Sequence, residues 1–487
     1  MQLKDKLLYL KVQIIVIKEK KIMQNIYYQP EGYAFGDCMP FYKDGKFYLY
    51  HQRDTRNPEP FGEPFGWALA VTEDFVHYED KGEVLLRGKD TEQDQFIFAG
   101  SVFEGEGQYH AFYTGYNRDF ATEGKAAQVL MHATSDDLLH WTKSADKLKL
   151  PPQMGYDPND WRDPYVLWNE DSKEYILILG AHKQNNKQIK TGCTVYFTSN
   201  DLEHWEFKGD FWAPNMFCMH EMPDLFCIGD WWYLLTTEYS ENNKTIYRKS
   251  RSIFGPWQMP DDDAFDGRAY YAARSCGDSE HRYLFGWVAS KDQDKDINNW
   301  IWGGTLVVHE LVQEENGDLK VKMPDSVHNA FAEKMSNDLF EEKVIETDSG
   351  INEVIIEECD EETFLFETVV SFKSGTHAFG VNIFEEKETG DAYRFDIEIK
   401  NRKVDFNRTP NLPWFRYMAQ GSERPLSLEA EKEYLLQVVV DGTVVTLYLN
   451  NTALNVRAYE PKGKTISFYV KDGSANIKRP RLYSLKK

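Results

Sequence analysis

The protein has 487 residues, and its hydrophobic fraction of 41% and charged fraction of 28% are typical of folded globular domains. A chain of this length predicts two domains rather than one core. The formal net charge of −23 repels phosphate backbones, which argues against nucleic acid as a partner.

The first residues of the chain differ from the rest. Residues 1–22 mix lysines with apolar runs too short for a membrane-spanning helix, and no A-x-A-like cleavage site follows them. We therefore expect residues 1–27 to form an extension outside the folded domains, and we expect no membrane partner. The six cysteines include no CxxC pair, which argues against a zinc site or a disulfide scaffold and favours a reducing, cytoplasmic location.

A repeated motif follows. Three segments read Ser/Thr, any residue, Asp, a large apolar residue, any residue, His, aromatic: TEDFVHY at 72–78, SDDLLHW at 135–141 and SNDLEHW at 199–205. Their first residues lie 63 and 64 positions apart, and a looser copy, SRSIFGPW, spans 250–257. Such regular spacing indicates a repeated structural unit. We expect the histidines of the motif to form hydrogen bonds within each unit; they are His77, His140 and His204.

Short apolar runs bounded by turn residues recur in step with this motif and predict hairpins. They lie at 44–52, 107–115, 171–180, 229–239 and 279–288. A repeat of this length with several short strands is typical of a four-stranded propeller blade. We therefore predict a five-bladed β-propeller over residues 28–325. A tandem of β-sandwiches would explain the strands but not their even spacing.

The pattern changes after residue 325. Residues 326–345 show no strand alternation and are expected to be a linker. Alternation returns over 346–487, and the Asp441-Gly442 pair between two apolar runs is a strong hairpin signal. We predict a smaller C-terminal β-sandwich there, which gives an all-β fold overall. We also expect copies of the chain to associate through this domain.

Three acidic residues precede inner strands of the predicted propeller at matching places. Asp37 and Glu221 each stand ten residues before the aromatic residue that begins the following strand, and Asp163 stands ahead of the third hairpin. Inner strands surround a central channel, so these carboxylates should converge and repel one another. Glycosidic cleavage requires one proton-donating acid and one ionised carboxylate, and a third acid can bind sugar hydroxyls. Arg162 would help to keep Asp163 ionised. Ordinary turn aspartates are the alternative for each acid alone.

Further aromatic and histidine residues have two readings each. His220 could bind sugar or pack against its neighbours. Trp67 could stack on a sugar or cap a blade, and Tyr271 could line the pocket or the core. No three-histidine set has metal-ligand spacing, so neither a metal nor another cofactor is predicted.

Several blocks resemble glycoside hydrolase family 32, the invertases, inulinases and levanases. RDP at 162–164 and EMPDLF at 221–226 are similar to the family's Arg-Asp-Pro and Glu-Cys-Pro-Asp blocks. FYLYHQ at 47–52, FAGS at 98–101 and FDGRAYYAA at 265–273 also resemble family segments. The resemblance implies Asp37 as nucleophile, Glu221 as general acid/base and Asp163 as transition-state stabiliser. Together with the readings above, it gives these candidate substrate-binding residues: Gln52, Trp67, Phe98, Ser101, Arg162, His220 and Tyr271.

The nucleophile block departs from the family. It reads Gly36-Asp37-Cys38-Met39-Pro40, where the family usually has Asn-Asp-Pro-Asn-Gly. Met222 replaces the family's cysteine, and Ala269 stands where an acidic residue is usual. The three acids are therefore retained, but the polar residues around them differ from those usual in the family. Cys38 is expected to line this pocket.

The resemblance implies a β-fructofuranosidase-like hydrolase that releases fructose from a small carbohydrate by a retaining double displacement. Such a pair of carboxyl groups lies about 5–5.5 Å apart. Three alternatives stay open. They are an arabinofuranosidase- or xylosidase-like propeller that inverts with Asp37 as base, a fructosyltransferase, and a sugar-binding propeller without catalytic activity.

Overall fold

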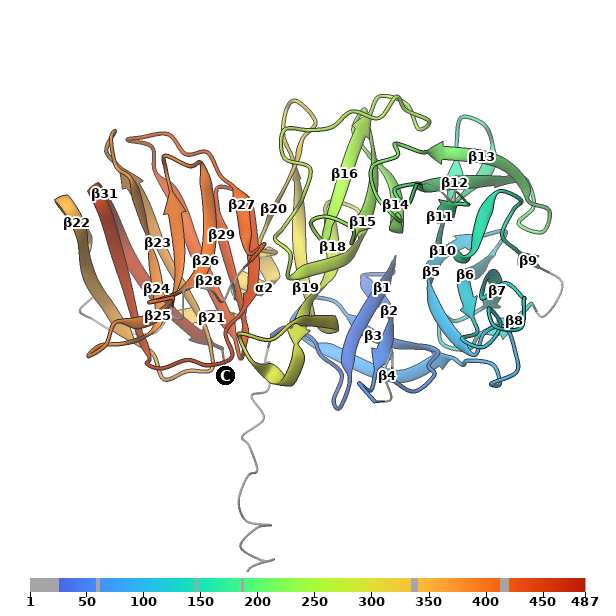
Figure 1. Ribbon diagram of the computed structural model, residues 1–487, viewed down its shortest axis with the longest axis horizontal. Coiled ribbons are helices and arrows are strands. Elements are labelled where there is room, and N and C mark those ends of the chain that lie inside the picture. The colour runs from blue at the N-terminus through green and yellow to red at the C-terminus, as the bar shows by residue number, and fades with distance from the viewer. Residues whose placement is uncertain are drawn as a thin grey trace, which may run out of the picture.

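The computed structural model describes residues 26–57, 62–144, 148–184, 188–333, 340–411 and 420–486. Nearly all of the described elements are β-strands. The exceptions among them are a short helix, α2 (Asp325–Asn329), and a 3₁₀ turn (Asp292–Asp294). Figure 1 shows two β-rich bodies side by side along the long axis. The extension expected over residues 1–27 lies outside the described residues except for its last two positions.

The strands before α2 form five successive antiparallel groups of three to five strands each. They are β1 (Ala34–Lys43), β2 (Lys46–Asp54), β3 (Trp67–Thr72) and β4 (Tyr78–Leu85); β5 (Phe96–Gly105), β6 (Gln108–Tyr116), β7 (Gln128–Ser135), β8 (Thr142–Lys143) and β9 (Lys149–Leu150); β10 (Tyr156–Asn169), β11 (Glu174–Lys183), β12 (Gly192–Ser199) and β13 (Glu206–Trp212); β14 (Glu221–Ile228), β15 (Trp231–Glu238) and β16 (Lys244–Ser250); and β17 (Tyr270–Gly277), β18 (Arg282–Lys291), β19 (Trp300–Gln313) and β20 (Leu319–Lys322). Each group is one blade.

The ring closes between its last and first blades. β1 pairs with β19 at Phe35 and Gly304, so the fifth and first blades share one sheet in the order β17-β18-β19-β1-β2-β3-β4. The predicted five-bladed propeller is confirmed as the fold of this part of the chain.

The repeated sequence motif forms the turn after the third strand of three blades. In the first blade, Asp74 Oδ1 accepts hydrogen bonds from the backbone N–H groups of Val76 and His77. The His77 ring bonds to Asp74 Oδ2 at 2.7 Å. His140 and His204 repeat this contact with Asp137 and Asp201. The expectation of hydrogen bonds within each unit is confirmed, because the motif is a local turn that fixes its own backbone.

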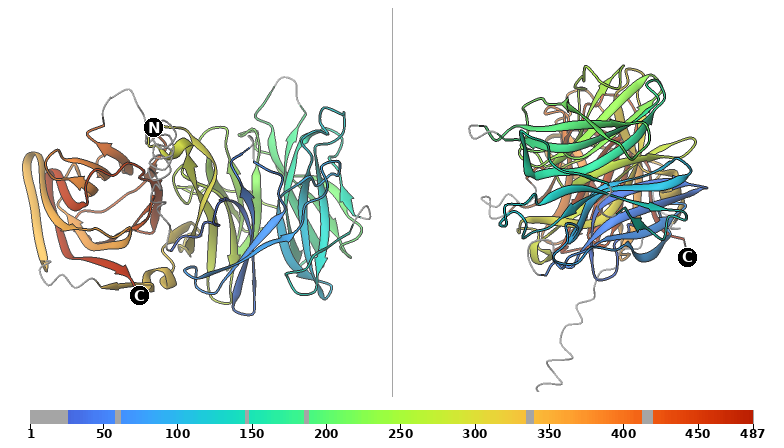
Figure 2. Two further views of the ribbon diagram at one scale, coloured as in Figure 1. Left: turned by 90° about the horizontal axis from the view of Figure 1, so that it is seen from below. Right: turned by 90° about the vertical axis from the view of Figure 1, so that its right-hand side faces the viewer.

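The C-terminal body is a single hydrogen-bonded network of strands. They are β21 (Phe331–Glu333), β22 (Glu342–Glu358), β23 (Thr363–Phe372), β24 (Ala378–Glu386), β25 (Asp391–Glu398), β26 (Lys403–Thr409), β27 (Glu423–Pro425), β28 (Tyr434–Asp441), β29 (Val444–Leu449), β30 (Thr452–Arg457) and β31 (Thr465–Leu485). β31 pairs with four other strands, and positive φ angles at Asp472 and Arg479 mark its bends. The network thereby curls around a second apolar core, as Figure 2 shows from below. The predicted all-β propeller followed by a sandwich is confirmed, with a sandwich that approaches a barrel.

A buried polar network joins the two bodies. Asp266 Oδ2, before β17, bonds to His309 Nε2 on β19 at 3.0 Å and accepts from Asn455 Nδ2 on β30 at 2.6 Å. The other ring nitrogen of His309 bonds to Tyr448 on β29 at 2.8 Å. Because all four side chains are buried, the fifth blade is fixed to the C-terminal sheet.

Among the described residues, no helix is long and apolar enough to cross a membrane. The domain boundaries, association through the C-terminal domain and the cytoplasmic location remain predictions from the sequence.

Candidate active site

The first strand of each blade contains a bulge. The pairing with the second strand slips between Phe35 and Cys38, Phe98 and Gly100, Arg162 and Tyr165, Glu221 and Asp224, and Tyr271 and Arg274. Bulges bend a strand and re-aim its side chains, and they are common beside active sites. Positive φ angles at Asp163, Met222 and Ala272 accompany three of these bulges.

The three predicted acids all lie at these bulges but not at equivalent positions. Glu221 is the paired residue before its bulge, Asp163 is the first bulged residue, and Asp37 is the second. The expectation that they occupy the same place is therefore wrong by one residue at each step. The side chains still meet, because all three line one cavity of about 450 Å³.

This cavity, which we call the acid cavity, contains six of the ten predicted site residues. Asp37, Gln52, Phe98, Arg162, Asp163 and Glu221 line it. The remaining lining residues are Tyr116, Ala121, Ala127, Gln128, Asn159, Asp160 and Trp302. The phenyl ring of Phe98 stacks on that of Tyr116 with centroids 4.5 Å apart, which forms an aromatic wall.

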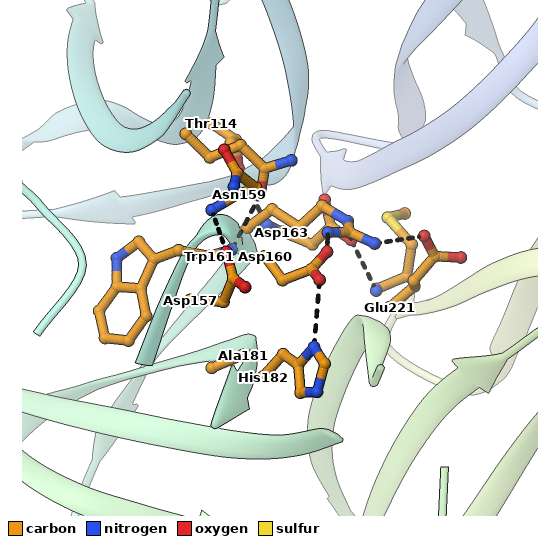
Figure 3. A network of polar contacts seen from close by, with 12 residues as sticks. Thr114, Asp157, Asn159, Asp160, Trp161, Asp163, Ala181, His182 and Glu221 are labelled. Atoms are coloured by element: carbon orange, nitrogen blue, oxygen red, sulfur yellow. Dashed lines mark hydrogen bonds and ion pairs between the residues drawn. The ribbon is translucent and has the colours of Figure 1, made fainter. Parts of the chain in front are cut away.

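Both carboxylate oxygens of Glu221 are held. Arg162 Nη2 donates to Oε1 at 2.8 Å, and the Tyr271 hydroxyl donates to Oε2 at 2.6 Å. Arg162 is itself fixed by Asp160, whose Oδ1 accepts from Nη1 at 2.6 Å, and Asp160 also contacts His182 (Figure 3). This chain of contacts fixes the direction in which Glu221 points.

Asp163 is buried behind Glu221. Its Oδ2 accepts from the backbone N–H of Met222 at 3.0 Å, and its own N–H donates to Thr114 Oγ1 at 2.9 Å (Figure 3). Burial raises the pKa of Asp163, and the charge of Arg162 opposes this effect. The carboxylate therefore needs nearby positive charge to stay ionised.

Asp37 receives a hydrogen bond on one oxygen. Trp287 Nε1 donates to Oδ1 at 3.0 Å. Burial raises the pKa of Asp37 to about 8; the Asp163 carboxylate adds to the effect, and the Trp287 bond opposes it. Two acids in one cavity thus cannot both ionise without a cost.

A second cavity of about 590 Å³ adjoins the first, and Glu221 and Trp302 line both. We call it the outer cavity. Its described lining includes Tyr271, Trp287, Trp300, Arg268 and Lys291, with Gln420 from the C-terminal body. Glu221 therefore lies at the boundary between the two spaces. Tyr271 is part of the site through the outer cavity.

Three predicted substrate-binding residues do not line either cavity. Trp67 is fully buried and donates its indole N–H to Phe98 O at 3.0 Å. Ser101 is buried and accepts from the Val166 N–H. His220 is fully buried, contacts Thr194 Oγ1, and its pKa is lowered to about 3 by burial. The structure thus assigns these three to blade packing, which corrects the sequence interpretation.

The altered residues beside Asp37 are also packing residues. Cys38 and Met39 are buried in the propeller core rather than exposed in the pocket, so the expected role of Cys38 as pocket lining is wrong. The bulge explains this, because Asp37 belongs to its two unpaired residues, whereas Cys38 and Met39 are back in regular pairing with His51 and Tyr50 on β2.

Sequence reasoning missed several lining residues. Trp287 lies in the predicted hairpin at 279–288 without a site motif, and Asp160 stands two residues before Arg162 without a motif of its own. Trp302, Gln128 and Asn159 gave no signal, since they lie outside the repeated segments.

Among the described residues, one group of acids has the spacing of a metal site: Asp396, Glu398 and Asp405 on the C-terminal sheet. Lys403 Nζ already bonds to Asp405 at 2.6 Å, which neutralises part of this charge. We assign no metal to it.

Comparison with known proteins gives consistent matches. The sequence model described as the glycosyl hydrolases family 32 N-terminal domain matches residues 36–322. The chain is 22% identical to sucrose-6-phosphate hydrolase of Escherichia coli, covering 90% of this chain and 89% of that protein. It is 23% identical to the levanbiose-producing levanase of Bacillus subtilis, covering 92% and 88%.

Solved structures share the fold. The fructan 1-exohydrolase IIa of Cichorium intybus superimposes with a TM-score of 0.78 at 15% identity, covering 97% of this chain and 98% of that one. The sucrose-6-phosphate hydrolase of Lactobacillus gasseri gives a TM-score of 0.74 at 20% identity, covering 99% and 96%.

Proposed function

The chain belongs to glycosyl hydrolase family 32 and is an O-glycosyl hydrolase of the fructofuranosidase type, and from this premise we propose that it releases fructose from β-fructosides with retention of configuration. One observation carries the proposal: carboxylates from three blades line one cavity, and Glu221 alone among them also borders the outer cavity. A fructosyl unit in the acid cavity and its leaving group in the outer cavity would be joined by a glycosidic oxygen beside Glu221.

The roles follow from these positions. Asp37 attacks the anomeric carbon while Glu221 gives its proton to the leaving oxygen, so the glycosidic bond breaks as the fructosyl-enzyme ester forms. Glu221, now a carboxylate, takes a proton from water, which attacks the ester and releases fructose and free Asp37. Asp163 stays ionised, accepts hydrogen bonds from sugar hydroxyls and stabilises positive charge on the ring. Hydrogen bonds from Arg162 and Tyr271 hold the Glu221 carboxyl group in position.

Two basic residues favour a second candidate, a leaving group that carries an anion such as phosphate. Arg268 and Lys291 line the outer cavity, where Glu221 is the single acid among the described lining residues. Lys291 Nζ lies 4.6 Å from the centroid of the Trp300 ring, and burial lowers its pKa to about 8. A basic cavity on a chain with a net charge of −23 suits an anionic ligand.

Product identification tests the proposal. The protein is incubated with sucrose, sucrose 6-phosphate, inulin, levan and aryl arabinosides and xylosides, and NMR records the first-formed anomer. Free fructose formed with retention supports the proposal, and an inverted product or cleavage of arabinosides or xylosides would favour the inverting rival. Oligosaccharide products longer than the substrate would indicate fructosyl transfer. Sugar binding without turnover would indicate a non-catalytic sugar-binding protein. Glu221→Gln should lose several orders of magnitude in rate, and a rate near that of the wild type would overturn its role.

A matched comparison tests the anionic leaving group. Arg268→Gln should lower kcat/KM for sucrose 6-phosphate roughly tenfold or more, because one charge-assisted contact is removed. Its kcat/KM for sucrose serves as the internal control and should change little. Equal losses on both substrates would contradict a specific anion contact.

A further inference from the structure

A buried arginine lies beneath the acid cavity. Arg274, on β17, is 1% exposed and is the residue that ends the bulge of the fifth blade. Its guanidinium reaches across the channel, where Nη2 donates to Asp163 O at 2.8 Å and Nη1 donates to Gly100 O and, at 3.4 Å, to Pro164 O. One side chain thus ties the fifth blade to the second and third blades.

Two of the three carbonyls that Arg274 holds, those of Asp163 and Pro164, belong to the bulge that presents the Asp163 side chain. Asp163 has a positive φ of 62°, a conformation that costs free energy for a non-glycine residue. Hydrogen bonds from a buried cation to the Asp163 and Pro164 carbonyls favour this backbone over a relaxed one. Arg274 therefore fixes the direction in which the Asp163 carboxylate enters the cavity.

The charge of Arg274 also acts on the acids. The groups that face it are Asp163, Asp224, Tyr165 and Asp37, from the third, fourth and first blades. Asp37 is faced in turn by Asp163, Glu221, Trp287 and Arg274, and the guanidinium opposes the rise in its pKa. Arg162, the other cation of the site, is engaged by Glu221 and Asp160. An arginine keeps its charge when buried, so this counter-charge is permanent.

Resting on the function proposed above, we infer that Arg274 is a positioning residue, which fixes the bulge of Asp163 and supplies the buried positive charge beneath Asp37 and Asp163. It touches no part of the cavity that the substrate fills, since it lines neither the acid cavity nor the outer cavity. It acts through the carboxylates above it.

Charge and hydrogen bonding can be separated by two substitutions. Arg274→Gln removes the charge, and Arg274→Lys keeps it with fewer donors. Arg282→Gln is the matched control, because Arg282 is a partly buried arginine of the same blade that bonds to Ser275 Oγ rather than to the Asp163 bulge. Thermal melts of each variant establish that it is folded.

The measurement is the acid limb of the profile of kcat/KM against pH, which reports the pKa values of essential groups in the free enzyme. Arg274→Gln should move this limb to higher pH by about one unit or more, because the carboxylates lose their counter-charge. Arg274→Lys should keep the limb and lower kcat, and Arg282→Gln should change neither. A folded Arg274→Gln protein with the wild-type limb would overturn the inference. If Arg274→Gln does not fold, a one-unit shift in Arg274→Lys would overturn it instead.

A titration without turnover separates this inference from the proposed function. Aspartate labelled with ¹³C at Cγ gives a carboxyl signal for Asp37, assigned by its loss in Asp37→Asn. Its midpoint should rise in Arg274→Gln and stay in Arg282→Gln, even if no β-fructoside is cleaved. Equal midpoints in wild type and Arg274→Gln would contradict the charge role, whereas absence of turnover alone would contradict only the fructosidase assignment.

Discussion

Trp287 donates its indole N–H to Oδ1 of Asp37 at 3.0 Å, and this bond favours the ionised form of a carboxyl group whose pKa is raised by burial. We expect Trp287→Phe to keep the ring and lose the donor. A hydrogen bond to a charged group contributes about 1.5–3 kcal/mol, so kcat/KM should fall roughly 10- to 150-fold. Steady-state kinetics on the best substrate measures this. Trp168→Phe, at a partly exposed position on β10, is the control, and equal losses in both variants would contradict the role of the bond.

Asp37 should also limit stability at high pH. Its pKa of about 8 lies above the ordinary value of 3.8, so between these values the folded state holds a proton that the unfolded state has released. Stability therefore falls as pH rises through this window, and the loss is complete above about pH 8. Asp37→Asn abolishes activity and also removes the free-energy cost of ionising this buried carboxyl group. Thermal melts should show its Tm exceeding that of the wild type by roughly 2–5 °C at pH 8.5, with a smaller difference at pH 5. A gain that does not grow with pH would rule out this origin.

Sequence periodicity predicted the strands and hence which blocks reach the channel. Asp163 and Glu221 could be assigned because each belongs to a block followed by an apolar strand. Their neighbours could not, since side chains alternate along an extended chain and His220 points to the opposite side from Glu221. The repeat is regular only to within a residue or two, so it could not predict which bulge position each acid takes. Trp302 lies beside the acid cavity because β19 pairs with β1 at Gly304 and Phe35, a contact between distant segments that no local pattern encodes.

Gly36 is required by the close approach of Trp302. A Cβ at position 36 would overlap the six-membered ring of Trp302 and lie 3.0 Å from Gln52 Cβ. The φ angle of Gly36 is not positive, so the constraint is space and not backbone strain. Gly36→Asn, which introduces the usual family residue, should displace Trp302 from the wall of both cavities. We expect kcat/KM to fall roughly tenfold or more, in line with the cost of small misplacements in an active site.

A double-mutant cycle tests this explanation. Trp302→Ala creates the room that an asparagine side chain at position 36 needs, so adding Gly36→Asn to it should cost little. Kinetic measurements on both single variants and the double variant give the coupling. If the two losses multiply as independent effects, steric conflict with Trp302 is not the reason for glycine at this position.

The Asp266–His309 contact should decide whether the two bodies stay joined. Burial raises the pKa of Asp266, but hydrogen bonds from His309 and Asn455 outweigh burial and lower it, so the carboxylate is ionised and fully engaged. Asp266→Ala leaves His309 and Asn455 buried without their shared partner, and we expect a loss of about 3–5 kcal/mol in the free energy of unfolding. Denaturant unfolding followed by Trp fluorescence measures this, with the exposed Asp348→Ala as control. Since a lowered pKa gives stability that is lost as pH falls through it, the difference between wild type and Asp266→Ala should shrink in acid. A loss no larger than that of Asp348→Ala would show that apolar packing alone holds the fifth blade against the C-terminal sheet.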